Sequence, residues 1–229
     1  MSSRDPRLPH HRPLAIAHRG GNSLPAAREA IRLRADMLET DIWLSRGKLE
    51  VRHKHRLGPI LWERWSLGRG WGPQLELREL LRETPDDALL FLDLKGRELD
   101  LGTAILRELR QTAPNRLVAA CGRNYAQLDA LRDEPNVVLF YSVGEEKEWA
   151  EAWPRLEAMR YPALSLRFSL ATPQVLDRLH AMGATVVCWG VETFAQLALL
   201  DDKGLDGATT DNGALIALIN ERRDGVTTA

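Results

Sequence analysis

The feature that most constrains the fold is a series of eight short apolar runs, each followed by a stretch of helical periodicity. The runs are Leu14–Ala17, Met37–Leu44, Leu89–Leu94, Leu117–Cys121, Val137–Tyr141, Ala163–Leu166, Thr185–Trp189 and Gly207–Thr210. Strands that are nearly continuous in apolar character are typical of parallel sheets buried on both faces. Eight strand–helix units therefore predict an α/β fold, a (β/α)8 TIM barrel in a single domain. A doubly wound open sheet, which usually has fewer strands, is the alternative.

Residues typical of helix ends support this alternation. Thr172-Pro173 offers a capping hydroxyl and a first-turn proline before the periodic run Val175–Met182, and Gly183 follows that run. Thr193 directly precedes the periodic run Phe194–Leu200 and offers it a capping hydroxyl. We therefore expect helices to start and stop at these positions between the strands.

The sequence predicts one domain with short terminal segments, and its composition changes at only one place, residues 56–73. We expect an N-terminal extension over residues 1–13, the barrel over 14–222 and a C-terminal tail over 223–229. Residues 56–73 contain four glycines, two prolines and three tryptophans. They predict an irregular insertion after the second strand, over the barrel mouth. It could be a small satellite core, or a lid or substrate platform, because loops at this end of a barrel carry active sites.

Charge and hydropathy exclude several classes of protein. The net charge is −1 with acidic and basic residues mixed, whereas a nucleic-acid-binding protein needs a basic stripe. Residues 1–13 lack the apolar run of a signal peptide, and every apolar stretch is far shorter than the about 20 residues of a membrane span. Cys121 and Cys188 lie in apolar stretches, as buried thiols do. We therefore expect a cytoplasmic protein without a disulfide, a nucleic-acid partner or stable membrane insertion.

Two groups of polar residues lie at the ends of the first two strands. His18-Arg19-Gly20, followed by Gly21, combines a fixed cation with glycines that let backbone approach a ligand, which suggests an anion site. Glu39 and Asp41 share one face of an apolar strand, about 7 Å apart along the chain. Burying both is costly unless an interior Arg or Lys or a cation compensates them. Carboxylate oxygens favour Mg²⁺ or Ca²⁺ over zinc.

Further polar residues follow. Alternation along residues 50–55 would place His53 and His55 on one face, and it places Asp93 and Lys95 together at the end of the third strand. A barrel gathers its catalytic groups at the C-terminal ends of its strands. The sequence thus predicts acids, cations and histidines at one end of the barrel.

In this order, the motifs resemble the glycerophosphodiester phosphodiesterase family. The matching elements are His18-Arg19-Gly20, Glu39-x-Asp41, His53, Asp93-Leu94-Lys95, Trp189 and the run Gly204-Leu205-Asp206-Gly207-Ala208-Thr209-Thr210-Asp211. The resemblance extends from residue 14 to about residue 216. It implies hydrolysis of a small glycerophosphodiester to glycerol phosphate and an alcohol.

The resemblance also implies roles for single residues. His18 and His53 would be the general acid and base, and Glu39, Asp41 and Asp93 would hold a divalent metal ion, Mg²⁺ or Ca²⁺. Such an ion polarises a phosphate and stabilises developing charge, while a histidine protonates the departing alkoxide.

Three other residues would contact the substrate. By the same resemblance, Arg19 and Lys95 would neutralise the phosphate and Trp189 would bind the substrate.

This chain departs from the family pattern in four places. Pro25-Ala26-Ala27-Arg28 replaces a Pro-Glu-Asn-Thr element, Asp93 stands where Glu is usual, and Lys54 replaces an Asp. The turn before His53 is one residue short, so the pattern leaves open whether His53 or His55 works with His18.

Two other functions remain alternatives. One is a lysophospholipase D-like activity on lysolipids, in which the Trp-rich residues 56–73 would hold an acyl chain. The other is a non-catalytic barrel that binds phosphorylated ligands, although binding alone needs no pair of histidines. The nucleophile could be water or a neighbouring hydroxyl of the substrate.

Overall fold

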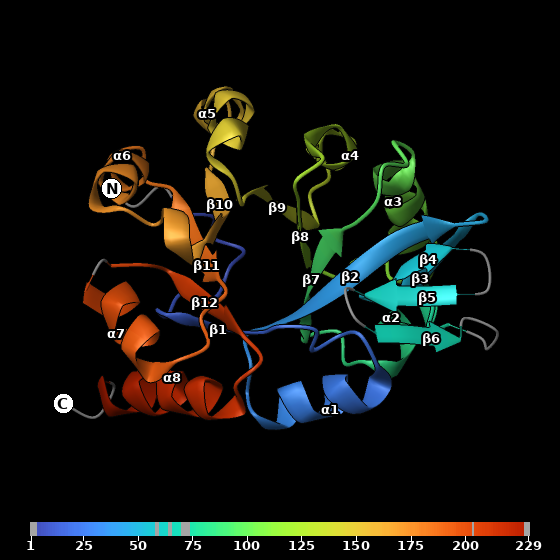
Figure 1. Ribbon diagram of the computed structural model, residues 1–229, viewed down its shortest axis with the longest axis horizontal. Coiled ribbons are helices and arrows are strands. Elements are labelled where there is room, and N and C mark those ends of the chain that lie inside the picture. Colours follow the sequence, from blue (N-terminus) through green and yellow to red (C-terminus); the bar gives the residue numbers. More distant parts are fainter. Residues whose placement is uncertain (1–3, 58–59, 64–65, 70–73, 203, 227–229) are drawn as a thin grey trace.

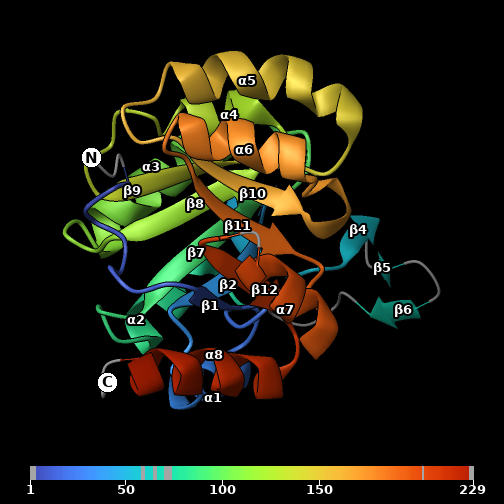
Figure 2. The same cartoon turned by 90° about the vertical axis from the view of Figure 1, so that its left-hand side faces the viewer.

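The eight predicted strands close into a parallel barrel with helices around it (Figures 1 and 2). The computed structural model describes residues 4–57, 60–63, 66–69, 74–202 and 204–226. The barrel strands are β1 (Leu14–Ala17), β2 (Met37–Ser45), β7 (Leu89–Leu94), β8 (Val118–Gly122), β9 (Val137–Val143), β10 (Ala163–Arg167), β11 (Thr185–Trp189) and β12 (Gly207–Thr210). Strand β1 pairs in parallel with both β2 and β12, which closes the ring. The prediction of a (β/α)8 barrel is confirmed, and the open-sheet alternative is wrong.

Helices cover the outside of the ring (Figure 2). They are α1 (Leu24–Arg32), α2 (Leu77–Glu83), α3 (Leu101–Thr112), α4 (Tyr125–Asp129), α5 (Trp149–Glu157), α6 (Pro173–Ala181), α7 (Phe194–Asp202) and α8 (Gly213–Val226), with single 3-10 turns η1 (Glu146–Glu148) and η2 (Phe168–Leu170). As expected, the Thr172 hydroxyl caps α6 by accepting a hydrogen bond from the Val175 N–H. Within the described residues, no helix is long and apolar enough to cross a bilayer.

Alternate residues of each strand face the barrel interior and the helices. In β7, Phe91 belongs to the interior cluster, while Leu90 and Leu92 belong to the cluster between strands and helices. Both faces are therefore largely apolar, which is why the strands are nearly continuous apolar runs in the sequence. Phe91 and Phe140 meet edge to face inside the barrel, 5.1 Å between ring centroids. Truncating either ring to Ala would cost about 3–5 kcal/mol.

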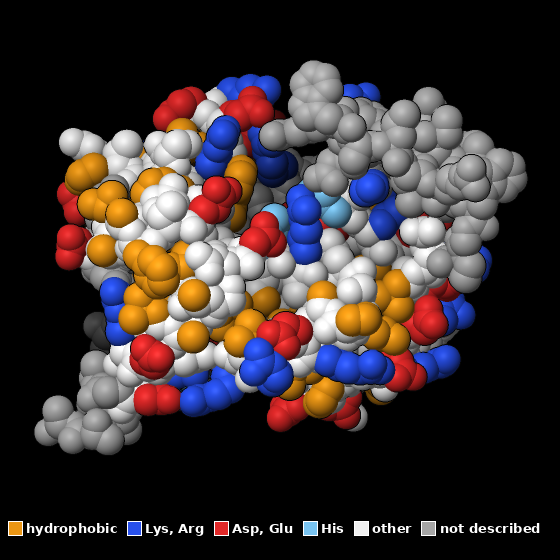
Figure 3. All heavy atoms as spheres, turned by 60° about the horizontal axis from the view of Figure 1, so that its bottom comes forward, with side chains coloured by type: hydrophobic (Ala, Val, Ile, Leu, Met, Phe, Trp, Pro, Cys, Tyr) orange, Lys and Arg blue, Asp and Glu red, His pale blue; other side chains and the backbone are white. Residues whose placement is uncertain are grey.

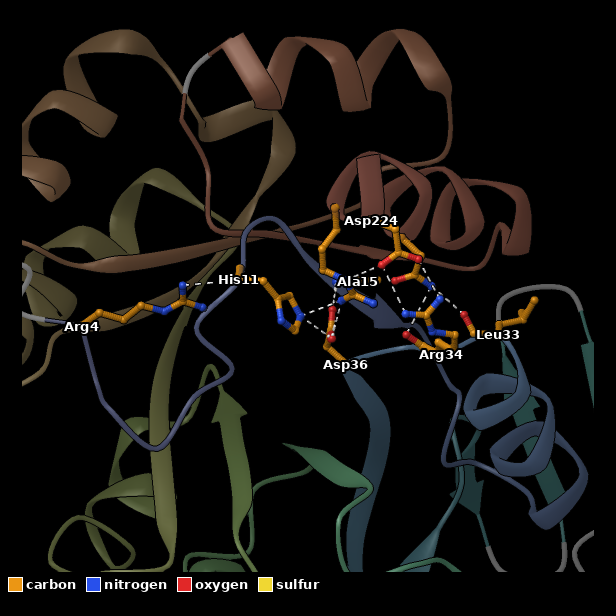
Figure 4. A network of polar contacts seen from close by, with 9 residues as sticks. Arg4, His11, Ala15, Leu33, Arg34, Asp36 and Asp224 are labelled. Carbon is orange, nitrogen blue, oxygen red and sulfur yellow. Dashed lines mark hydrogen bonds and ion pairs between the residues drawn. The ribbon is translucent and has the colours of Figure 1, made fainter. Parts of the chain in front are cut away.

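The N-terminal segment covers one end of the barrel. Leu8 is 2% exposed and joins the interior cluster beside Leu14 and Leu89, which begin their strands. Figure 4 shows the network next to this segment, in which His11 Nε2 lies 2.6 Å from Asp36 Oδ1. With the N-terminal end covered, the C-terminal ends of the strands are left for a site.

The hairpin after β2 leads into a separate small sheet. Strand β3 (Lys48–Val51) pairs antiparallel with β2, and β4 (His55–Leu57), β5 (Ile60–Glu63) and β6 (Ser66–Arg69) form a three-stranded sheet beside the barrel (Figure 2). The irregular path expected for residues 56–73 is wrong where the chain is described, while residues 58–59, 64–65 and 70–73 lie outside the described residues. The role of this segment over the barrel mouth stays a prediction.

The expected common face of the two histidines is also wrong. Residues 52–54 form a bend between β3 and β4, so His53 and His55 do not lie on one continuous strand. The side chain of His55 lies outside the described residues. Cys121 and Cys188, in contrast, are both buried, as expected.

Candidate active site

Polar residues from the first three barrel strands converge at their C-terminal ends. These residues are His18, Arg19, Glu39, Asp41, Asp93 and Lys95, and they are joined by His53 from the bend after β3. Figure 3 shows histidine side chains in a hollow of the surface, with Lys or Arg and Asp or Glu side chains around them. Trp189 ends β11, which lies across the ring from β7.

Three carboxylates form the centre of this group. One oxygen each from Glu39, Asp41 and Asp93 lies within 4.8 Å of the others. Alternation along β2 brings Glu39 and Asp41 to the same side, and Asp41 is the register partner of Asp93 on β7. The shorter side chain of Asp93 thus still reaches the other two acids.

A single ammonium group lies among these acids. The Lys95 Nζ is 3.0 Å from Asp41 Oδ1 and also contacts the Asp93 carboxylate. Burial, with added repulsion from Asp41 and Asp93, raises the pKa of Glu39 well above its ordinary value. Burial likewise raises the pKa of Asp93, although Lys95 counteracts part of this effect. One lysine therefore does not compensate three converging carboxylates, of which Glu39 and Asp41 are buried and Asp93 is partly buried.

Asp41 differs from the other two acids. Burial alone would raise its pKa, but hydrogen bonds from His53 and Asn22 and the charge of Lys95 hold the pKa well below its usual range. Asp41 is accordingly an anion at neutral pH.

The site has the chemistry of a hard-cation site. Asp41 Oδ1 is buried and accepts no hydrogen bond from the described residues, although Lys95 Nζ lies nearby. Together with Glu39 and Asp93, it offers oxygen ligands and excess negative charge, which Mg²⁺ and Ca²⁺ require. The residues present therefore fit a divalent metal ion.

The contacts of His53 assign its tautomer. Its Nε2 lies 2.6 Å from Nη2 of Arg19, and its Nδ1 lies 3.0 Å from Oδ2 of Asp41. A guanidinium can only donate, so Nε2 accepts and Nδ1 carries the proton that is donated to Asp41. The lone pair of Nε2 thus accepts a hydrogen bond from Arg19 at the barrel mouth, and a ligand that binds Arg19 can displace this donor.

His18 lies across from His53. The two ring centroids are 6.4 Å apart and the rings are nearly perpendicular. Nδ1 of His18 is 3.0 Å from Oδ1 of Asp211, which follows β12. Both imidazoles are about one-third exposed, so both can reach a ligand at the barrel mouth.

The loop after β1 folds tightly against β2. Arg19 has a φ of 54°, and its backbone N–H donates to Glu39 Oε2 over 2.6 Å. A Cβ on Gly21 would lie 1.8 Å from Thr40 Oγ1. The observed close approach of Gly21 is therefore to β2, whereas we expected an approach to a ligand.

Sequence reasoning missed two polar partners, Asn22 and Asp211. The Asn22 side chain donates to Asp41 Oδ2 over 2.6 Å and accepts from the Asp41 N–H over 2.8 Å. A single Asn in a loop has no periodic signal, so only its place after the glycines could have indicated it. Asp211 is the last residue of the matched C-terminal motif, but the sequence alone assigned it no role.

The chain is similar to proteins of a known family. The model of the glycerophosphoryl diester phosphodiesterase family matches residues 92–215. This segment includes Asp93, Lys95 and Trp189, while His18 and His53 precede it. No curated protein sequence matches the chain.

Solved structures share the fold at low sequence identity. An Oleispira antarctica phosphodiesterase in complex with the product sn-glycerol-3-phosphate is 21% identical, with 91% of this chain and 97% of that chain covered and a TM-score of 0.75. A glycerophosphodiester phosphodiesterase from Parabacteroides distasonis is 20% identical over 92% and 98%, with a TM-score of 0.73. One from Thermotoga maritima is 20% identical over 94% and 100%, with a TM-score of 0.69. At these identities, the likeness establishes the barrel fold.

Proposed function

We propose that this chain, which belongs to the glycerophosphoryl diester phosphodiesterase family, hydrolyses a glycerophosphodiester to glycerol phosphate and an alcohol with the help of a divalent cation and two histidines. The observation that carries the proposal is the convergence of Glu39, Asp41 and Asp93 beside His53. The Oleispira antarctica structure, which contains sn-glycerol-3-phosphate, supports the choice of product.

The three carboxylates would hold Mg²⁺ or Ca²⁺. When bound, the cation would supply charge that polarises the phosphate and stabilises the transition state. Cation binding would lower the raised pKa of Glu39, because the added positive charge offsets the cost of burial and the repulsion from Asp41 and Asp93. Lys95 would keep its contacts with the same acids and present its charge to the phosphate.

His53 would act as the general base. A phosphate oxygen can take the hydrogen bond that Arg19 now gives to Nε2, which frees Nε2 to accept a proton from the nucleophile. Asp41 would stabilise the resulting imidazolium through the Nδ1–H. Movement of the Arg19 guanidinium from His53 to the phosphate would thus neutralise the phosphate and free Nε2 of His53 to act as the base.

His18 would act as the general acid. As an imidazolium, His18 would keep its Nδ1 proton at Asp211 and give its Nε2 proton to the departing alkoxide, which leaves a neutral ring. Trp189, on the far side of the ring, would contact one of the two alcohols of the diester.

The test is a panel of glycerophosphodiesters that carry choline, ethanolamine or glycerol, incubated with protein and Mg²⁺ or Ca²⁺. Phosphorus NMR should detect glycerol phosphate with at least one of them. Glu39→Gln should abolish turnover, while His180→Ala, an exposed histidine on α6, should serve as the unaffected control.

Two other outcomes would replace the proposal. Turnover of lysolipids alone would identify a lysophospholipase D-like enzyme, and binding of diesters without any turnover would identify a non-catalytic barrel.

A further inference from the structure

Arg167 faces the barrel axis at the mouth. In β10, Ala163 belongs to the interior cluster, whereas Leu164 and Leu166 belong to the outer one. Alternation therefore turns Ser165 and Arg167 inward, and Arg167 is the exposed last residue of the strand. In the ring of strands, β10 lies four positions from β2 in either direction. Arg167 is thus across the barrel from the strand that carries Glu39 and Asp41.

Trp189 lies next to this arginine. It is the register partner of Arg167 on β11 and faces inward like Val187 two residues before it. The Arg167 Cζ is 5.8 Å from the centroid of the Trp189 ring. The pair offers a flat apolar surface beside a guanidinium.

A second arginine, Arg123, lies on this side of the mouth. Arg123 follows β8, and its Nη2 lies 2.5 Å from a carboxylate oxygen of both Glu145 and Glu148. A Cβ at Gly144 would lie 3.1 Å from Trp189 and 3.3 Å from Arg123, so these two side chains border one small space.

The two arginines differ in charge compensation. Two carboxylates neutralise Arg123, whereas no carboxylate within the described part of the chain lies within ion-pair distance of Arg167. An exposed, inward-facing cation without a counter-ion is available to an anionic ligand.

We propose that Arg167 and Trp189 form a subsite for an anionic group on the leaving alcohol of the diester. The inference rests on the proposed function, because a phosphodiester held at Glu39 and Asp41 directs one of its alcohols across the mouth to β10 and β11. Glycerol is uncharged, so an anion that meets Arg167 belongs to the other alcohol. The preferred substrate is therefore a glycerophosphodiester whose leaving alcohol carries a phosphate or carboxylate.

The test compares two diesters that differ by one phosphate, glycerophosphoglycerol and its terminal phosphate ester. The wild-type protein should have a kcat/KM at least about fivefold higher for the anionic diester, and high salt should reduce this ratio. Arg167→Gln should lower the ratio about five- to tenfold, mainly through KM, and Arg167→Lys should restore part of it.

Arg160 provides a matched control. It is an exposed arginine near the opposite end of β10, and its Cζ lies 5.1 Å from the Tyr161 ring. Arg160→Gln removes the same charge from the protein and should leave the ratio unchanged.

The outcomes separate the two claims. Equal kcat/KM for both diesters, or equal ratios in wild type and Arg167→Gln, would overturn the subsite while the proposed function stands. If neither diester is turned over, the proposed function fails. Calorimetric binding of the two diesters to wild type and Arg167→Gln then decides: a preference that the substitution removes supports the subsite, and equal affinities overturn it.

Discussion

The Nδ1 atom of His53 lies 3.0 Å from Oδ2 of Asp41, one of the three possible cation ligands, and the other oxygen of this carboxylate accepts no hydrogen bond from the described residues. Because His53 comes from the bend after β3, this contact ties the hairpin to the barrel. One carboxylate thereby orients a histidine and offers an oxygen to a cation. Replacement of either His53 or Asp41 should therefore affect both proton transfer and cation binding.

His53→Ala should lower turnover by about two to four orders of magnitude, the usual contribution of a general base. His55→Ala should cost far less, because His55 begins β4, in a different sheet from the acids. Steady-state rates of the two variants on the same diester make the comparison. Equal losses would indicate a shared proton relay, and the reverse order would assign the base to His55.

Asn22→Ala should weaken cation binding about 10- to 100-fold, because both hydrogen bonds that fix Asp41 from this side are lost. Calorimetric titration with Mg²⁺ or Ca²⁺ measures the change. Asn136→Ala is the control, since among the described residues the Asn136 side chain donates to the Pro114 carbonyl alone. A variant with lower thermal stability but unchanged cation affinity would reduce Asn22 to a purely structural role.

Asp93→Asn should also weaken cation affinity while the barrel stays folded. The substitution removes one of the three converging carboxylates and leaves a side chain of nearly the same shape. Circular dichroism checks the fold, and titration checks the affinity. A slower rate with unaltered cation affinity would indicate that Asp93 positions Lys95 and is not a cation ligand.

Stability should depend on pH through Glu39. Its pKa is raised in the folded state by burial and by Asp41 and Asp93, so the folded state binds the proton more tightly than the unfolded state. Stability of the metal-free protein should therefore fall as pH rises through the interval above the unfolded pKa of Glu39.

Cation binding should reverse this trend. At saturating Mg²⁺ or Ca²⁺, Tm at pH 7 should rise by ~5–10 °C, with a smaller rise near pH 5. Glu39→Gln should remove most of the pH dependence in the metal-free protein. A cation effect equal at both pH values would argue against Glu39 as a ligand.

The sequence predicted the barrel well because its strands are buried on both faces. Leu89–Leu94 is apolar except for Asp93 and Thr185–Trp189 is apolar except for Thr185, and the strands have these same limits. The same logic placed Glu39 and Asp41 on one side of β2, since alternation holds inside a regular strand.

The predictions were wrong or incomplete where the chain leaves regular structure. Alternation paired His53 with His55, but the bend at residues 52–54 separates them. Asn22 was missed because its contact with Asp41 depends on how the loop after β1 folds onto β2. Neither a bend nor a loop contact leaves a periodic pattern in the sequence.

The central claim is that a divalent cation held by Glu39, Asp41 and Asp93 is required for hydrolysis. The most direct measurement is glycerol phosphate release by one protein sample before chelation, after chelation and after addition of Mg²⁺ or Ca²⁺. The account predicts that chelation abolishes turnover, that one of these ions restores it, and that Glu39→Gln is not restored. Full turnover in a rigorously metal-free sample would contradict it.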